Sequence, residues 1–214
     1  MTSGPIYTYI ALHVHTCISP SSSVSAIASG TSSPTAMSST TDPYRKLTPR
    51  KVALITGATG GIGKATSLAL AKTGEYELAL HYNAANEDTR SALSANIATN
   101  TGIQPHFFQA DISSYDAVRK LYADVIKAMG AVDVLFNNAG SVGGHSGAKS
   151  LADIPMGVFE ETYRVNAGSG ILLTQLCLPH MEEQGWGRVV FCSSVAGLTG
   201  GECWLRYETM SGVD

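Results

Sequence analysis

The amino-acid sequence predicts an α/β fold in which a doubly wound parallel sheet carries helices on both faces. Apolar runs of strand length alternate with helical patterns from residue 51 to residue 192, and the joins between them are short. The first strand pattern runs directly into a glycine-dense turn, TGATGGIG at 56–63. Helices that connect parallel strands must pack on the faces of the sheet, so this alternation favours the doubly wound class. A chain of 214 residues is long enough to bury a core of that kind.

Five strands and four helices are expected in this region. Val52 to Ile55 forms an apolar run bounded by glycine, as in a strand covered on both faces. Gly102 is placed to end the second helix, and Ser113 or Ser114 to cap the third. The expected strands are 51–56, 77–82, 105–110, 132–136 and 188–192, and the expected helices are 62–72, 86–100, 115–129 and 157–181.

The N-terminal segment 1–45 has a different composition and is expected to be a disordered, Ser/Thr-rich tail. Residues 21–41 are mostly Ser, Thr, Ala and Pro without a charge, which leaves too little apolar surface to offset the entropy of ordering. Residues 6–18 are apolar like a signal peptide, but no Lys or Arg precedes them and two histidines interrupt them. Met37 is an alternative start, and our hypothesis is that 1–36 are dispensable or a start-site artefact. Residues 46–214 form the single expected domain.

Charge and cysteine usage restrict the partners and the compartment. The net charge is −3 and no basic stripe is present, which argues against nucleic acid as a partner. The four cysteines form no CxxC pair, so neither a zinc site nor another metal site is expected, and a reducing, cytoplasmic location is the simplest interpretation. No apolar run reaches the length that spans a membrane.

The glycine turn is the first candidate for a binding site. Glycines 57, 60, 61 and 63 permit a tight turn and a close ligand approach. The following helix would present free backbone N–H groups and the positive end of its dipole to that ligand. A pyrophosphate suits this environment. The alternative is a glycine-rich turn that binds nothing.

Further motifs at fixed places make the chain, over roughly 49–207, resemble the short-chain dehydrogenase/reductase family. TGATGGIG is similar to the TGxxxGxG cofactor turn of that family, although the same residues also fit the TGxxGxxG of its longer, sugar-nucleotide-handling branch. NNAG at 137–140, after the fourth strand, favours the short branch. The resemblance implies a Rossmann-type sheet of seven strands, of which this chain contains five.

The same resemblance implies a dinucleotide site and its contacts. Asp111 and Ile112 resemble the pair beside the adenine ring, although Asp111 could instead cap the next turn. The second strand ends in HYNAAN, without an acid until Glu87, and an acid there would bond the ribose 2′-OH and repel a 2′-phosphate. NADP(H) is therefore favoured over NAD(H), with Lys64 either a helper or a solvated helix residue. The implied cofactor-binding residues are Gly57, Gly61, Ile62, Gly63, Asn83, Asp111, Ile112, Asn138, Ala139 and Gly140.

Three catalytic residues are implied by the resemblance: Asn166, Ser194 and Tyr207. Asn166 would hold a water in the proton path, Ser194 (or adjacent Ser193) would bond the substrate oxygen, and Tyr207 would donate the proton. A tyrosine of pKa ~10 does this only beside a cation such as the family lysine. Ser211 stands at the position expected for that lysine. The alternatives are a structural Asn166 and a surface Tyr207.

The implied function is NAD(P)H-dependent hydride transfer between the cofactor and a small carbonyl or alcohol, as in 3-oxoacyl-carrier reductases. The chain stops at Asp214, before the family's last two strands, so an open edge strand and impaired activity are expected. A homo-oligomer is expected of a full-length relative and is left open here. The alternatives are a catalytically inactive dinucleotide-binding protein and a non-functional truncated gene product. His145 and its glycine-rich loop could meet substrate or be a surface loop.

Overall fold

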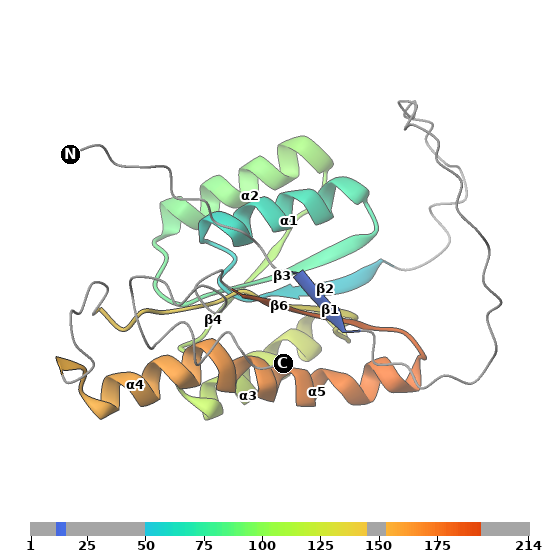
Figure 1. The fold of residues 1–214 in the computed structure, drawn as a ribbon. Coiled ribbons are helices and arrows are strands. Elements are labelled where there is room, and N and C mark those ends of the chain that lie inside the picture. The colour runs from blue at the N-terminus through green and yellow to red at the C-terminus, as the bar shows by residue number, and fades with distance from the viewer. Residues whose placement is uncertain (1–11, 16–49, 145–152, 194–214) are drawn as a thin grey trace, which may run out of the picture.

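A six-stranded sheet forms the centre of the molecule (Figure 1). The computed structural model describes residues 12–15, 50–144 and 153–193. The strands are β1 (Leu12–His15), β2 (Lys51–Ile55), β3 (Tyr76–Tyr82), β4 (His106–Gln109), β5 (Val134–Asn137) and β6 (Arg188–Cys192), in the order β1-β6-β5-β2-β3-β4. All pairings among β2 to β6 are parallel, which confirms the predicted doubly wound sheet of five strands.

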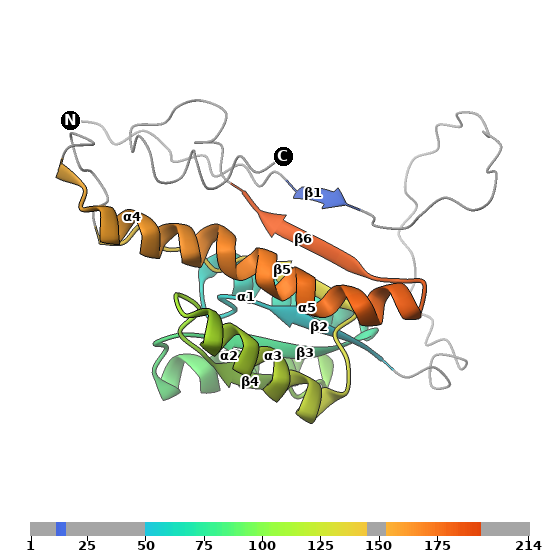
Figure 2. The ribbon, with the colours of Figure 1, turned by 90° about the horizontal axis from the view of Figure 1, so that it is seen from below.

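Helices cover both faces of this sheet. α1 and α2 lie on one face, and α3 lies on the other beside a long rod made of α4, η3 and α5 (Figures 1 and 2). Ser114, rather than Ser113, caps α3 by accepting a hydrogen bond from Ala117 N. No helix in the described ranges has the length and apolar character to cross a bilayer. The bounds are α1 (Gly61–Thr73), α2 (Glu87–Thr101), α3 (Tyr115–Met129), α4 (Met156–Tyr163), η3 (Arg164–Gly168) and α5 (Ser169–Glu183).

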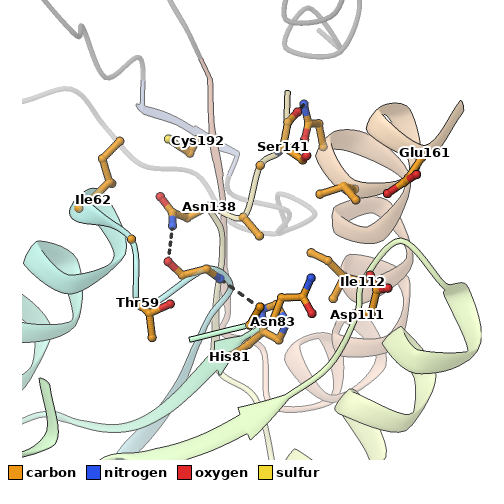
Figure 3. Close-up of a pocket in the computed structure, with 18 of the residues that line it drawn as sticks. Thr59, Ile62, His81, Asn83, Asp111, Ile112, Asn138, Ser141, Glu161 and Cys192 are labelled. Atoms are coloured by element: carbon orange, nitrogen blue, oxygen red, sulfur yellow. Dashed lines mark hydrogen bonds between the residues drawn. The ribbon is translucent and has the colours of Figure 1, made fainter. Parts of the chain in front are cut away.

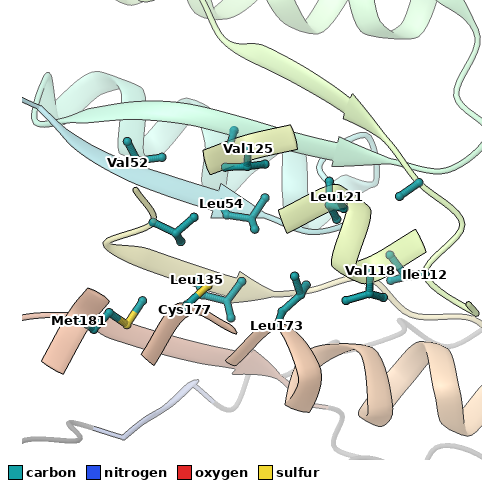
Figure 4. Packing of buried hydrophobic residues seen from close by; sticks show 13 residues of the cluster. Val52, Leu54, Ile112, Val118, Leu121, Val125, Leu135, Leu173, Cys177 and Met181 are labelled. Atoms are coloured by element: carbon teal, nitrogen blue, oxygen red, sulfur yellow. The ribbon is translucent and has the colours of Figure 1, made fainter. Parts of the chain in front are cut away.

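The core between the sheet and the α3/α5 layer holds the strands in place (Figure 4). Its side chains are apolar and almost fully removed from water, and each Val, Leu or Met contributes about 1.5–3 kcal/mol by burial. Burial also raises the pKa of the Cys177 thiol to about 12, so this cysteine packs as a neutral apolar group. The sheet supplies Val52, Leu54 and Leu135, α3 supplies Val118, Leu121 and Val125, and α5 supplies Leu173, Cys177 and Met181.

The long helix predicted for 157–181 is interrupted by one π-helical turn, η3. The turn contains Asn166, Ala167 and Gly168. The hydroxyl of Ser169, the next residue, donates to Val165 O at 2.7 Å. Single π turns widen a helix locally and are frequent at functional sites. The interruption places the Asn166 amide against the backbone of Ser141, as described below.

The strand β1 lies within segment 1–45, for which the sequence predicts disorder. Leu12–His15 pairs antiparallel with β6, in the register Leu12 with Cys192 and His15 with Val189. Over this register, β1 covers the outer edge of β6. That edge carries backbone N–H and C=O groups that need partners, and an extended segment of the same chain supplies them. The rest of segment 1–45 lies outside the described residues.

Candidate functional site

A cleft of about 860 Å³ opens at the carboxyl end of the parallel strands. β2 lies between β3 and β5, so the chain crosses to opposite sides of β2 and leaves a crevice there. Ligands of doubly wound proteins bind at such a crevice, and this volume is typical of small-molecule sites. Its lining comprises Gly57, Thr59, Gly60, Gly61, Ile62, His81, Asn83, Ala84, Asp111, Ile112, Asn138, Ala139, Gly140, Ser141, Glu161, Val165, Asn166, Cys192 and Ser193.

Two glycines of the turn after β2 are required by its geometry. Gly57 has φ +63°, and a Cβ there would lie 2.9 Å from Ala139 Cα. A Cβ on Gly63 would lie 2.4 Å from Gly57 O and 2.7 Å from Ala58 Cα. Gly63 is not among the residues that line the cleft, and its missing Cβ lets α1 pack closely against the turn.

The N-terminus of α1 faces the cleft and is suited to an anion. Gly60, the N-cap, has no side chain to occupy the first backbone N–H groups, and the first turn contains no acidic residue. Gly60, Gly61 and Ile62 all line the cleft. Free N–H groups and the positive end of the helix dipole together favour a phosphate at this position.

The NNAG segment holds the glycine turn in place from the β5 side (Figure 3). Asn138 Nδ2 donates to Thr56 O at 2.9 Å and to Gly57 O at 3.2 Å. The hydroxyl oxygen of Thr56 accepts from Asn138 N at 2.9 Å and from Ala139 N at 3.0 Å. Four hydrogen bonds therefore join two loops that are distant in sequence.

Asp111 and Asn83 lie at the β3/β4 side of the cleft. Asp111 Oδ1 accepts from Ser113 N at 3.0 Å, so this carboxylate caps the following turn and also lines the cleft. Asn83 is exposed, and its carbonyl accepts from Gln109 Nε2 at 2.9 Å. Glu87 is the first acid after β3, and its two oxygens bind Arg90 and Ser91 of its own helix. Neither Glu87 nor Asp88, the acids nearest to Asn83 in the sequence, is among the residues that line the cleft.

Asn166 lies at the opposite wall of the cleft. Its Oδ1 accepts from Ser141 N at 2.7 Å, and its Nδ2 donates to Ser141 O at 3.0 Å. This pair of bonds anchors the loop that follows NNAG to the π turn. Cys192, at the end of β6, also lines the cleft, and burial raises the pKa of its thiol, which keeps it neutral.

Nine of the ten residues expected to contact a cofactor line this cleft, and Gly63 is the exception. Asn166 lines it too, whereas Ser194, Tyr207 and His145 lie outside the described residues. Sequence reasoning did not single out His81, Ser141, Glu161 or Cys192. Only His81 carried a visible signal, since it is a titratable side chain within the otherwise apolar run of ELALHY.

Sequence comparisons match this chain to one protein family and to several individual relatives. The family described as short chain dehydrogenase matches residues 51–210. The uncharacterized oxidoreductase YmfI of Bacillus subtilis is 34% identical over 162 residues, which are 76% of this chain and 63% of that protein. The 3-oxoacyl-[acyl-carrier-protein] reductase FabG of Aquifex aeolicus is 32% identical over 159 residues, 74% of this chain and 61% of that protein. The chain thus spans less than two thirds of these relatives.

Solved structures agree with the sequence comparisons. A metagenomic short-chain oxidoreductase in complex with NADP superposes with a TM-score of 0.67 at 26% identity, over 75% of this chain and 70% of that chain. The NADPH-dependent 3-quinuclidinone reductase of Rhodotorula rubra gives 0.62 at 26% identity, over 77% and 60%. The glycine turn, the NNAG brace and these matches lead to one conclusion: the chain belongs to the short-chain dehydrogenase/reductase family.

Proposed function

We propose that this protein is an NADP(H)-dependent oxidoreductase that transfers a hydride between the nicotinamide and a small carbonyl or alcohol substrate. The observation that supports it is the single cleft that joins the glycine turn, the free N-terminus of α1 and the NNAG segment. In the described residues Cys177 and Cys192 are both free thiols, in keeping with a reducing, cytoplasmic compartment. Cell fractionation with an antibody to the native protein tests that location.

The residues present fit a dinucleotide. The absence of side chains at Gly57 and Gly63 keeps the turn compact, and the uncapped α1 leaves N–H donors for the pyrophosphate. Asp111 and Ile112 would hold the adenine, and the Asn138–Gly140 segment would border the nicotinamide half. When bound, the nicotinamide supplies or accepts the hydride.

The catalytic assignment follows the family pattern. Ser194 would hydrogen-bond the substrate oxygen and Tyr207 would donate or remove its proton. Asn166 would keep the Ser141 loop at the substrate end of the cleft, since both polar atoms of its amide bind the Ser141 backbone. Ser211 stands at the sequence position of the family lysine, the cation that would lower the pKa of Tyr207. We therefore expect slow turnover relative to family members that carry the lysine.

The preference for NADP(H) is argued from the end of β3. Asn83 has no charge to repel a 2′-phosphate, and the carboxylate of Glu87 is engaged by Arg90 and Ser91. Two similar solved structures are described as a complex with NADP and as an NADPH-dependent reductase, and a similar L-rhamnose 1-dehydrogenase is described as using NAD(P)(+).

The test is a fluorescence titration of the 214-residue protein with NADPH and with NADH. NADPH should bind at least about tenfold more tightly, a difference of about 1.4 kcal/mol. Asn83→Asp should weaken NADPH and strengthen NADH, because the new carboxylate repels the 2′-phosphate and accepts from the 2′-OH. Asp88→Asn, in the first turn of α2 and outside the cleft lining, is the matched control and should change neither affinity. Tighter binding of NADH by the unsubstituted protein would contradict the preference.

A second candidate function is a dinucleotide-binding protein without catalysis, and Ser211 is the observation that favours it. NADPH oxidation measured with a panel of ketones, sugars and 3-oxoacyl thioesters separates the two. Consumption of NADPH with any of them supports the oxidoreductase. Binding without consumption supports the alternative.

A further inference from the structure

His81 is a buried titratable side chain directly under the glycine turn, and the function proposed above gives it no role (Figure 3). It is 1% exposed and lies in β3, one residue before the strand ends. Its Nδ1 receives a hydrogen bond from Gly57 N at 3.2 Å, and its Nε2 is 3.0 Å from Ala110 O. The imidazole ring of His81 therefore joins the glycine turn to the segment that leads into Asp111.

These two partners decide the protonation of the ring. A backbone N–H can only donate and a backbone C=O can only accept, so Nδ1 must be bare and Nε2 must carry the proton. The ring is then neutral. Burial lowers the pKa of His81, and the hydrogen bond to Ala110 opposes that effect in part, so neutrality is maintained near pH 7.

Backbone hydrogen bonds of His81 and Tyr82 also hold the glycine turn and the segment before Asp111 against the end of β3. His81 O accepts from Ala58 N at 2.9 Å, and Tyr82 O accepts from Ala110 N at 3.1 Å. Gly57 is different, because its N–H donates to the imidazole of His81 and not to a backbone carbonyl. A second proton at Nδ1 would point at that N–H and remove its acceptor.

We propose that His81 is a positioning residue whose neutral Nε2–H form holds the Gly57 turn in its cofactor-binding conformation and couples it to the Asp111 segment. This inference rests on the proposed function, since it concerns affinity for the dinucleotide. Protonation of His81 then weakens cofactor binding through the conformation of the turn, although residues 56–60 of the turn carry no titratable side chain themselves.

The charged and titratable groups around His81 are few in the described residues. The turn 56–60 contributes none, and the segment 110–114 contributes only Asp111, which accepts from Ser113 N. His106 lies two residues before Phe108, the register partner of His81, and is exposed. Glu161 and Cys192 are the other titratable groups in the cleft lining.

The closing experiment measures NADP⁺ affinity by calorimetry between about pH 5 and about pH 7.5 for four forms of the full chain. The unsubstituted protein should lose at least about tenfold in affinity at the acid end. His81→Asn keeps an acceptor near the Nδ1 position and cannot titrate, so it should bind well and lose that dependence. His81→Leu removes the acceptor and should bind weakly at every pH. His106→Asn is the matched control and should keep the original profile.

A second measurement needs neither a variant nor the cofactor. ¹⁵N NMR of the free protein should show the Nε2–H tautomer of His81 and an acid titration that moves the Gly57 amide signal with it. A charged ring or the Nδ1–H tautomer near pH 7 would overturn the inference. So would His81→Leu binding NADP⁺ like the unsubstituted protein. If the unsubstituted protein does not bind NADP⁺ near pH 7.5, the proposed function fails instead. Titration of the cofactor's own phosphate changes the NADP⁺ affinity of all four forms equally. Its contribution therefore cancels when the pH dependence of the unsubstituted protein is compared with that of His81→Asn.

Discussion

Thr56 and Asn138 are 82 positions apart in the chain and are joined by two hydrogen bonds. Asn138 N donates to Thr56 Oγ1 at 2.9 Å, and Asn138 Nδ2 donates to Thr56 O at 2.9 Å. Thr56 directly follows β2 and Asn138 directly follows β5, so the pair ties together the two loops at the crevice of the sheet. The shape of the cleft depends on this connection.

Thr56→Val should test that connection. Thr56 is 2% exposed, and its hydroxyl accepts from two backbone N–H groups, which the substitution leaves buried without an acceptor. The free energy of unfolding should fall by about 1–3 kcal/mol, and NADP⁺ affinity should fall with it. Thr56→Ser retains the hydroxyl and is the control. Urea denaturation and calorimetry measure both effects, and equal stability of the two variants would contradict the role of the hydroxyl.

Alanine at two glycines of the turn should separate packing from ligand approach. Gly63→Ala places a Cβ 2.4 Å from Gly57 O, so it should cost about 1–3 kcal/mol of stability and also abolish tight NADP⁺ binding. Gly61→Ala meets nothing within 4 Å, so the fold should keep its stability. Gly61 lines the cleft, however, so its variant should still bind NADP⁺ more weakly. Thermal unfolding and calorimetry distinguish the two patterns, and a destabilised Gly61→Ala would refute this division.

Asp133, at the opposite end of the sheet, should matter for stability and not for binding. Its side chain is nearly buried, and it accepts from Val52 N at 2.7 Å and from Gln184 Nε2 at 2.7 Å, with His180 Nε2 at 3.3 Å. Asp133→Ala removes the acceptor of Val52 N, while Gln184 Nε2 keeps its bond to Trp186 O, and should lower the free energy of unfolding by about 2–4 kcal/mol.

The control for that substitution is Asp116→Ala, on the surface of α3. Asp116 is 3.7 Å from Arg119, and its side chain is 99% exposed, so the urea midpoint should stay unchanged. NADP⁺ affinity per folded molecule should be unchanged in both variants. A shift in affinity for Asp133→Ala would mean that the two ends of the sheet are coupled.

The stability of the fold should rise with pH through the titration of His81. Burial lowers the pKa of His81 below its usual value of ~6.5, so the unfolded chain binds this proton more tightly than the folded chain. The stabilisation is complete above ~6.5 and is lost as the pH falls through the folded-state pKa. Urea denaturation at about pH 5 and about pH 7.5 measures it. The difference should shrink in His81→Asn and persist in His106→Asn, and an unchanged difference in His81→Asn would exclude His81 as its source.

Much of the site could be predicted because its motifs are local. The glycine turn needs φ > 0 at Gly57 and close packing at Gly63, and only glycine meets both demands. Position 83, where an acid would favour NAD(H), is occupied by an asparagine, and this too can be read directly from the sequence. Ser141 and His81 could not be assigned in this way, because their importance lies in hydrogen bonds to Asn166 and Gly57, which the chain brings near only after folding.

The outer edge of the sheet and the interruption of the long helix also required the structure. Antiparallel pairing of Leu12–His15 with β6 joins segments that are far apart in the chain, and the composition of neither segment predicts this pairing. Similarly, the π turn around Asn166 follows a normal helical pattern in the sequence. Both depend on backbone groups whose partners come from elsewhere in the fold.

The amino-acid pattern by itself determined the order of strands and helices, the parallel sheet and the family, because apolar periodicity and glycine placement act over a few residues. The tertiary structure alone decided how the cleft is held. Thr56 meets Asn138, Asn166 meets Ser141 and His81 lies between Gly57 and Ala110, because packing of the sheet brings these backbone groups within hydrogen-bonding distance.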